Sequence, residues 1–396
     1  MTRNAVKMQK DERREALRGR DIVCFSHDWT GDPLSKTHLM RVLARDNRIL
    51  WVNALPNRMP TAASKDVSRI AKKLKSFAEP VREVEKNIFV LNPLVIPAYS
   101  SERLVALNRK MLVRQIRRSM RRLGFENVVN MIFNPAAGLI AGHLGESELI
   151  YYCVDEYTAF TGVAPGLKEI EEDLFRRSDV VIVSAEKLLE SKAQFNSRTH
   201  LIRHGTDWNH FRKAVDGKLD LPSEVANLPR PIIGFHGLIA DWVDIELIKK
   251  VAVHFSGGSV VLVGKTTLDA EEKVKTLDGV SNVHRLGRKP YGELPAYCAA
   301  FDVAINPFEI NELTLAANPL KVREYLAAGL PVVSTDIPEV RVLPDVFVGV
   351  SHAEFIEKIE YALANPKPRA AVSDAIETES WEAKVDELRE ILEEKR

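Results

Sequence analysis

The stretch from Asn318 to Thr335, NPLKVREYLAAGLPVVST, combines residue types that are suited to binding an anion. Asn318 is a favourable helix N-cap, and Pro319 fits the first helical position. The free N–H groups and partial positive charge of such a helix start attract phosphate, and Lys321 adds a full positive charge. Glu324 lies three residues later on the same helix face. We interpret the stretch as a nucleotide site, with Lys321 for a diphosphate and Glu324 for a ribose diol. The alternative is that the two side chains pair only with each other.

Short β-rich runs alternate with longer amphipathic segments along the whole chain, which is typical of parallel sheets with helices on their faces. The first series of predicted strands is Ile22–Ser26, Arg48–Asn53, Ile88–Asn92, Val128–Phe133, Leu149–Val154, Val180–Ser184 and Leu201–Arg203. The second is Ile232–Gly237, Ser259–Val263, Val283–Leu286, Val303–Asn306, Val332–Ser334 and Val346–Val350. Two such series predict an α/β protein with two doubly wound domains.

The domain limits follow from composition. A charged segment covers residues 1–20, and the first domain covers 21–208. Residues 209–230 lack periodicity and contain Gly217, Pro222 and Pro229, so we predict a linker there. The second domain covers 231–370. Residues 371–396 end in ESWEAKVDELREILEEKR, which predicts a terminal helix.

Ligands of open α/β sheets bind beyond the carboxyl ends of the strands, so the residues after each strand are the candidates for chemistry. They are His27 and Asp28, Asp155 and Glu156, His204, His236, Arg288 and Lys289, and Glu309 and Glu312. Of these, we expect Asp155 and His27 to be catalytic or to bind substrate. Alternatively, Asp155 caps a helix and His27 bonds backbone in its turn. Arg288, after Gly287, is a phosphate ligand or an exposed loop residue. We expect Glu156 to be a neighbour of the site rather than its base, and we expect structural roles for His204 and His236.

Composition narrows the class of protein. The net charge of +1 hides an excess of 12 positive charges over residues 1–150 and of 11 negative charges over the remainder. The three cysteines, Cys24, Cys153 and Cys298, lie far apart in apolar runs, as expected of buried thiols in a cytosolic protein. We find no secretory signal, and no run approaches the roughly 20 apolar residues of a spanning helix. We therefore expect a cytoplasmic protein with at most peripheral membrane contact and no nucleic-acid partner.

Several catalytic signatures are missing from the sequence. There is no Ser-His-Asp arrangement, HExxH, P-loop, DxD pair, or GxGxxG after the first strand. We therefore predict neither an obligatory metal nor a dehydrogenase cofactor.

Two basic segments interrupt the first domain. Residues 101–125 project as an amphipathic helix, and Lys65–Phe77 is similar but weaker. The basic face of the first segment carries Arg103, Lys110, Arg114, Arg117, Arg118 and Arg121. This is either a crossover helix with a solvated outer face or one whose basic face also binds anionic lipid head groups.

At this point the motifs resemble a known family. The chain resembles a GT-B glycosyltransferase of the large family 4 type, glycosyl transferases group 1, in a bacterial branch linked to exopolysaccharide or cell-surface glycan assembly. The strongest likeness is NPLKVREYLAAGLPVVSTDIPEV, similar to the donor-binding helix and strand of the family. Four further stretches are similar to other elements of the family: HGTDWNHF, LGRKPYGELPAYCAAFDVAINPF, IIGFHGLIADWVD and the terminal ESWEAKVDELREIL.

The resemblance implies twin Rossmann-like domains that face a cleft, with a nucleotide-sugar donor on the second and an acceptor on the first. It places Lys321 near the diphosphate and Glu324 on the ribose, and it implies work at the inner membrane surface. The chain departs from the family at Ala316, where the family has a sugar-contacting carboxylate, so Asn318 or Glu312 is expected to substitute. GLIADWV replaces the family's GR-x-x-x-x-K. Diphosphate binding then depends on Lys321, Arg288 and the backbone of Gly237.

The expected activity is transfer of a sugar from a nucleoside diphosphate sugar, a UDP- or GDP-sugar, to a lipid-linked or glycan acceptor. Family habit implies retention of the anomeric configuration, whereas an inverting enzyme would use Asp155 as base. The alternatives are a non-catalytic GT-B-like scaffold of a glycan assembly complex, or another sugar-nucleotide enzyme of the epimerase type. The sequence does not fix the donor, acceptor, linkage or oligomeric state.

Overall fold

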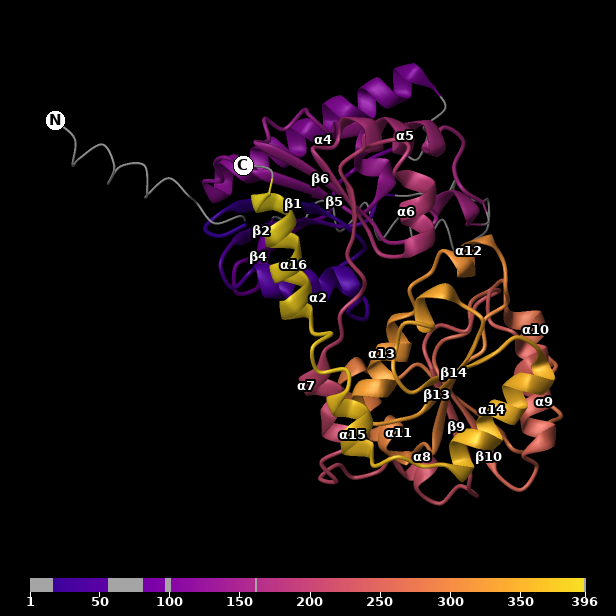
Figure 1. The fold of residues 1–396 in the computed structure, drawn as a ribbon. Helices are drawn as coiled ribbons and strands as arrows, with labels where there is room; N and C mark the ends of the chain where they lie inside the picture. Colours follow the sequence, from indigo (N-terminus) through magenta and orange to yellow (C-terminus); the bar gives the residue numbers. More distant parts are fainter. Residues whose placement is uncertain (1–16, 56–80, 97–100, 161, 395–396) are drawn as a thin grey trace, which may run out of the picture. The chain divides into compact units, whose positions relative to one another are not determined.

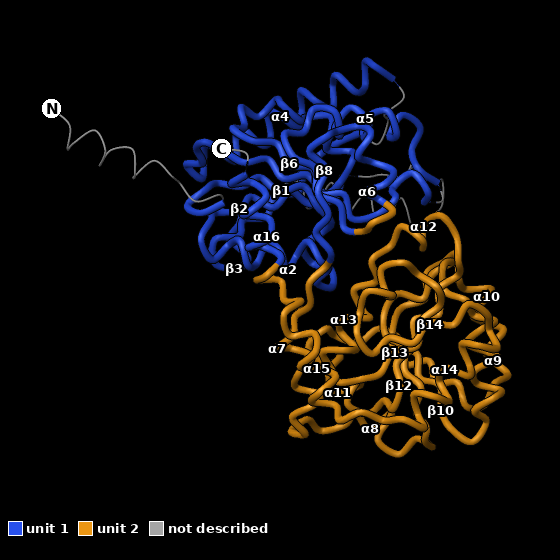
Figure 2. The backbone as a smooth tube through the Cα atoms, in the orientation of Figure 1, with its two compact units in different colours: residues 1–184, 188–203, 384–396 blue, residues 185–187, 204–383 orange. Residues whose placement is uncertain are grey.

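The computed structural model describes residues 17–55, 81–96, 101–160 and 162–394, which form two compact units. Unit 1 comprises residues 1–184, 188–203 and 384–396, and unit 2 comprises 185–187 and 204–383 (Figure 2). Most of the predicted charged segment 1–20 and the basic stretch Lys65–Phe77 lie outside the described residues.

Unit 1 is built on an eight-stranded sheet of order β3-β4-β2-β1-β5-β6-β7-β8, in which only β3 runs antiparallel to its neighbour. Its strands are β1 (Asp21–Phe25), β2 (Arg48–Val52), β3 (Arg82–Glu85), β4 (Ile88–Leu91), β5 (Val129–Ile132), β6 (Glu148–Cys153), β7 (Val180–Val183) and β8 (Thr199–Leu201). Continuous apolar runs such as β7, VVIV, are fully buried, as central parallel strands require. The charged edge strand β3, REVE, has no apolar pattern and was not predicted.

The helices of unit 1 include the predicted basic helix, α4. They are α2 (Ser35–Leu43), α4 (Glu102–Leu123), α5 (Leu167–Arg177), α6 (Glu186–Lys192), which begins in unit 2, and most of α16 (Trp381–Glu393), with the short turns η1 (Pro135–Ile140) and η2 (Tyr157–Ala159). Leu112, Ile116 and Met120 of α4 are buried, and its predicted basic residues are all exposed. Figure 1 shows α4 beside α5.

Unit 2 has a six-stranded parallel sheet of order β11-β10-β9-β12-β13-β14. Its strands are β9 (Ile232–His236), β10 (Ser259–Val263), β11 (Val283–Gly287), β12 (Val303–Asn306), β13 (Val332–Thr335) and β14 (Val346–Gly349). Its longer helices are α9 (Ile245–His254), α11 (Leu294–Ala300), α13 (Leu320–Ala327), α14 (His352–Ala364) and α15 (Arg369–Asp374). The short ones are α7 (Trp208–Phe211), η3 (Arg212–Ala214), α8 (Ser223–Ala226), α10 (Glu271–Lys275), η4 (Tyr291–Glu293), α12 (Glu312–Leu315) and η5 (Pro338–Val340). In Figure 1, α9 and α14 cover one face of the sheet, and α11, α13 and α15 cover the other.

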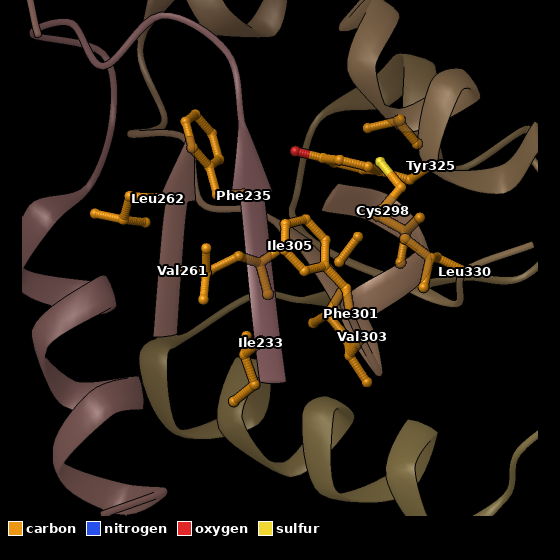
Figure 3. Close-up of a cluster of buried hydrophobic side chains, with 14 of the residues drawn as sticks. Ile233, Phe235, Val261, Leu262, Cys298, Phe301, Val303, Ile305, Tyr325 and Leu330 are labelled. Carbon is orange, nitrogen blue, oxygen red and sulfur yellow. The ribbon is translucent and has the colours of Figure 1, made fainter. Parts of the chain in front are cut away.

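The core of unit 2 fixes the position of its central strand, β9. Ile233 and Phe235 of β9 lie among buried residues of β10, β12 and the helices α11 and α13 (Figure 3). Between them, Gly234 leaves room for the ring of Phe301, because a Cβ at residue 234 would lie 2.0 Å from that ring. The end of β9, where candidate site residues lie, is therefore held by close packing.

Residues 209–230, predicted as a linker, instead form part of unit 2. They contain η3 and α8, and Phe211 and Val225 are buried in the core of the unit. Pro222, which we read as a linker signal, is the N-cap of the short helix α8, and Pro229 follows after that helix has ended. At the other end of unit 2, the chain rejoins unit 1 within the terminal helix α16, from Lys384 onward.

Candidate functional site

The strand order of unit 2 changes direction between β9 and β12. From β9 the chain moves outward to β10 and β11, and it then returns to β12 on the other side of β9. Helices on either side of such a switch point leave a crevice at the carboxyl ends of the two strands, where ligands of this fold class bind. Gly237 follows β9 and Phe308 lies just beyond β12. The first turn of α13 carries Lys321 to this place.

The ammonium group of Lys321 lies between two aromatic rings. Nζ is 4.5 Å from the ring centroid of Phe235 and 4.5 Å from that of Phe308. Within the described part of the chain, Lys321 forms no ion pair with Glu324. The sequence alternative, in which these two side chains only neutralise each other, is therefore not what the structure shows. The charge of Lys321 stays available to a ligand.

Gly237 makes room for the Lys321 side chain. Its φ is +131°, a conformation that favours glycine. A Cβ at residue 237 would lie 2.8 Å from Cε of Lys321 and 3.0 Å from Nζ. The predicted pair of Gly237 and Lys321 thus comes together, although the two residues are 84 positions apart.

Glu324 is the buried carboxylate of the site, and it faces His236. Glu324 is 6% exposed and His236 is 3% exposed. Oε2 of Glu324 lies 3.7 Å from Nε2 of His236, which has no hydrogen-bond partner in the described structure. The His236 ring stacks on Phe211 at 5.9 Å and packs edge-on against Tyr325 at 4.5 Å. Sequence reasoning gave His236 a structural role, but its free nitrogen places it among the polar groups of the site.

Burial brings the pKa values of Lys321 and Glu324 close to neutral pH. It raises the pKa of Glu324 to about 8, although the Lys321 ammonium opposes the rise. It lowers the pKa of Lys321 to about 7, and Glu324 opposes that change. Burial also lowers the pKa of His236 to about 3, with a further contribution from Lys321, so its imidazole is neutral. An anionic ligand would favour the charged form of Lys321.

The hydroxyl of Tyr325 joins α13 to the end of β9. It accepts a hydrogen bond from the backbone N–H of His236 at 2.6 Å and donates one to the His236 carbonyl at 3.1 Å. Because Tyr325 follows Glu324 directly, this bridge fixes the carboxylate relative to the strand. Nothing in the sequence pattern marks Tyr325 as more than an apolar helix residue.

Asn318 does not cap α13 as the sequence predicted. The helix begins at Leu320 after Pro319, and no side chain caps it. The Asn318 side-chain oxygen accepts a hydrogen bond from Nη1 of Arg323 at 2.5 Å, and the Asn318 carbonyl accepts one from Nδ1 of His204 at 3.0 Å. The reason is the fully buried guanidinium of Arg323, which needs polar partners that the apolar helix face does not supply. Asn318 therefore stabilises the loop before the helix.

The other two predicted donor side chains, Arg288 and Glu312, are exposed. Arg288 is exposed after β11, which β10 separates from β9. Its neighbour Lys289 pairs with Glu224 at 2.6 Å. Glu312 is exposed at the start of α12. The structure brings Gly237 and Lys321 together, with Glu324 on the same helix.

In unit 1, His27 follows β1 at the switch point between β1 and β5. Its ring nitrogens lie 3.1 Å from Oγ of Ser26 and 3.2 Å from Oγ1 of Thr37, and its carbonyl accepts a hydrogen bond from the Trp51 indole. Burial, together with the nearby Lys36 ammonium, lowers the pKa of His27 to about 3. The ring is therefore neutral and engaged on both sides, which makes His27 less suited than Asp155 to take up a proton.

Asp155 follows β6 and shares its surroundings with Lys36 of α2. Burial raises the pKa of Asp155, and the Lys36 ammonium opposes this rise. Lys36 Nζ donates to the Tyr157 hydroxyl at 3.3 Å, and that hydroxyl donates to the Phe133 carbonyl at 2.8 Å. Sequence reasoning missed Lys36, because it lies within a helix rather than directly after a strand. By contrast, Glu156 is engaged in a buried ion pair with Lys192 at 2.6 Å, which leaves it less suited than Asp155 to act as the base.

The described residues contain no group of three or more potential metal ligands. Among them, no helix is both long and apolar enough to cross a membrane. Cys24, Cys153 and Cys298 are buried free thiols.

Comparison with known proteins agrees with this architecture. Residues 230–365 match the model of the family described as Glycosyl transferases group 1. The chain is 23% identical over 220 residues to the putative teichuronic acid biosynthesis glycosyltransferase TuaH of Bacillus subtilis. This match covers 52% of the chain and 54% of TuaH, so it spans about half the length of that relative.

Solved structures share the fold over nearly the whole chain. Sucrose-phosphate synthase from Thermosynechococcus elongatus superposes with a TM-score of 0.68 at 16% identity, covering 95% of this chain and 98% of that one. HepE from Anabaena, solved with UDP and glucose, gives a TM-score of 0.65 at 14% identity, covering 94% and 99%. The family match thus lies within unit 2, and the chain as a whole shares the GT-B fold that its sequence motifs predicted.

Proposed function

We propose that the protein transfers a sugar from a nucleoside diphosphate sugar to a lipid-linked or glycan acceptor in bacterial cell-surface glycan synthesis. The observation that carries this proposal is the position of Lys321 in unit 2. Its ammonium lies unpaired at the switch point beside Gly237, with the buried Glu324 one turn deeper in α13. TuaH, named for teichuronic acid biosynthesis, and HepE, solved with UDP and glucose, support the classes of pathway and donor.

In this proposal, Lys321 binds the diphosphate and stabilises the negative charge that develops on it as the glycosidic bond breaks. Positioned charges of this kind usually supply the largest part of catalysis. The backbone N–H groups at the start of α13 add to the same field. Glu324 accepts hydrogen bonds from the ribose diol. Arg288, exposed after β11, is a further candidate to bind the diphosphate.

The donor is a UDP- or GDP-sugar, and the reaction proceeds with retention and without a bound metal. Front-face substitution would then leave the acceptor proton to the departing phosphate. If the configuration is inverted, Asp155 takes that proton, with Lys36 keeping its carboxylate charged. Determining the anomer of the product by NMR decides between the two outcomes. Under the inverting mechanism, Lys36→Met moves the acidic limb of the pH–rate profile upward, because removing the ammonium raises the pKa of Asp155.

The direct test is a thermal-shift panel of UDP, GDP, ADP and dTDP, followed by hydrolysis of the matching sugar nucleotide without acceptor. We expect one diphosphate to raise the melting temperature and its sugar nucleotide to be hydrolysed slowly. A scaffold protein would show no hydrolysis. If none of the four nucleotides binds, the proposed function is wrong.

We further propose that the exposed basic face of α4 binds anionic lipid at the inner membrane surface. Each Lys or Arg near such a surface contributes about 1 kcal/mol of attraction, so the loss of four such residues should weaken membrane binding measurably. The test variant replaces the arginines at 114, 117, 118 and 121 by Gln. The control replaces four exposed lysines of unit 2 by Gln, those at 213, 218, 273 and 275. In a flotation assay with phosphatidylserine vesicles, wild type and the control should float with the vesicles, and the α4 variant should not. A wild-type protein that never floats would contradict the lipid proposal.

A further inference from the structure

The two phenylalanines around Lys321 have a geometry that packing alone does not require. Phe235 is fully buried at the end of β9, whereas Phe308 is 7% exposed beyond β12. Their ring centroids lie at the same distance, 4.5 Å, from Nζ. The negative faces of both rings attract the ammonium electrostatically. Lysine chains usually keep this group in water instead.

Each part of this arrangement is attached to a fixed backbone. The Phe308 N–H donates to the Asn306 carbonyl at 3.1 Å and to Oγ1 of Thr335 at 3.2 Å. The residue after Phe235, His236, is held by the Tyr325 hydroxyl. The rings are therefore placed before any ligand arrives, and the flexible lysine chain is confined to one direction.

A ring pair differs chemically from a carboxylate partner. A carboxylate would neutralise the lysine and compete with an anionic ligand. An aromatic ring stabilises the cation but leaves its full charge, and it offers no acceptor that a diphosphate must displace. Ordering a lysine side chain costs up to about 2 kcal/mol of conformational entropy. Because the rings already order Lys321 in the free protein, ligand binding does not incur this cost again.

Resting on the nucleotide site proposed above, we infer that Phe235 and Phe308 are positioning residues for Lys321. Their rings favour its charged form and direct it to the space beside Gly237, where the diphosphate of the proposed donor binds. The other titratable groups around Lys321 are Glu324 on its own helix and His236 at the end of β9. Asp207, the N-cap of α7, acts on Glu324.

The test compares Phe308→Leu, which removes a ring but keeps an apolar side chain, with Phe308→Tyr, which keeps the ring. Phe347→Leu, in the edge strand β14, is the matched control. Calorimetric titration with UDP and GDP gives the affinity between pH 6 and 9. We expect Phe308→Leu to weaken binding about 5- to 30-fold. We also expect it to lower the pH above which binding is lost, because the ring favours the charged lysine. Phe308→Tyr and Phe347→Leu should bind as wild type does.

A second measurement needs no altered ring. In wild-type protein with 13C-labelled lysine, the Cε protons of Lys321 should resonate well upfield of the other lysines, because two rings shield them. Lys321→Arg identifies the signal. An unshifted signal, or unchanged nucleotide affinity in a folded Phe308→Leu variant, would overturn the inference. If wild type binds no nucleotide but the upfield signal is present, the ring geometry stands and the proposed function fails.

Discussion

At the scale of single residues, the site depends on one lysine whose charge has not been neutralised. Lys321 is half-buried and lies between two rings, and the nearby Glu324 is almost fully buried. Burial moves the pKa of each group toward neutral pH, that of Lys321 to about 7 and that of Glu324 to about 8. In the free protein, Lys321 and Glu324 therefore titrate near neutral pH, so that a bound anion can change their protonation.

This arrangement predicts that nucleotide binding depends on pH. As the pH rises through 7 to 8, Lys321 loses its proton and Glu324 becomes charged, and both changes oppose a diphosphate. Affinity for UDP or GDP should therefore fall between pH 6.5 and 9. At pH 8 binding should take up protons, because the ligand raises the pKa of Lys321. Calorimetry in two buffers of different ionisation enthalpy measures that uptake. Equal heats in both buffers would show that Lys321 does not change its protonation.

A methyl group at residue 237 should disturb the lysine directly. Gly237→Ala puts a Cβ within 2.8 Å of Lys321 Cε and strains a backbone at φ +131°. Strain of this kind costs about 1–3 kcal/mol, and part of it should appear as weaker nucleotide binding. Gly279→Ala is the control, since its Cβ would meet nothing within 4 Å. Titration of the two variants should show at least a tenfold difference in affinity. Equal affinities would mean that Lys321 does not need this space.

At the scale of elements, the contact between α13 and β9 sets the geometry of the site. Tyr325 carries it with one hydroxyl that bonds both backbone groups of His236. The same helix carries Lys321 and Glu324, so a shift of α13 against the strand would move both. The core around Phe235 and Phe301 supports this contact from below (Figure 3).

Removing this hydroxyl should lower stability. Tyr325→Phe leaves a buried N–H of His236 without its acceptor, which costs about 1–3 kcal/mol. Urea denaturation measures the free energy of unfolding. Tyr361→Phe, on a side chain that is 54% exposed, should stay within about 0.5 kcal/mol of wild type. A Tyr325→Phe variant as stable as this control would show that the bridge contributes nothing.

The sequence predicted the repeating elements well, because periodicity reports burial. Most strands of both sheets follow from apolar runs. The exceptions are the charged edge strand β3 and the half-buried β8 (Thr199–Leu201), which shares only Leu201 with the predicted strand Leu201–Arg203. Gly237, Lys321 and Glu324 follow from their positions after strands or at a helix start. What the sequence could not show depends on contacts between distant segments. The rings at 235 and 308 read only as core residues, and the preference of Asn318 for Arg323 over the helix start depends on tertiary burial.

At the scale of the whole molecule, the candidate site residues belong to two different units. Unit 2 holds Lys321, Glu324 and His236, and unit 1 holds His27, Lys36 and Asp155. The terminal helix α16 belongs to unit 1 from Lys384 onward, where Arg389 pairs with Asp46 at 2.8 Å. A change in this part of α16 should therefore act on unit 1.

Leu388, fully buried in α16, offers that test. Leu388→Ala should destabilise unit 1 by about 2–5 kcal/mol. Nucleotide affinity should stay unchanged, because the proposed site lies in unit 2. Val253→Ala, on a side chain that is 64% exposed, is the control. Scanning calorimetry with and without UDP or GDP separates the two effects. Loss of nucleotide binding in a Leu388→Ala variant whose unit 2 remains folded would contradict this division.

The central claim is that the start of α13 binds a nucleoside diphosphate through Lys321. Calorimetric titration of wild type and Lys321→Ala with UDP and GDP tests it most directly, with Lys275→Ala, an exposed lysine of α10, as the control. The account predicts that wild type binds either UDP or GDP, and that the control binds the same nucleotide with the same affinity. Lys321→Ala, with an unchanged melting temperature, should bind it about 10- to 150-fold more weakly, since a hydrogen bond to a charged group contributes about 1.5–3 kcal/mol. Equal affinity in Lys321→Ala and wild type would contradict the account.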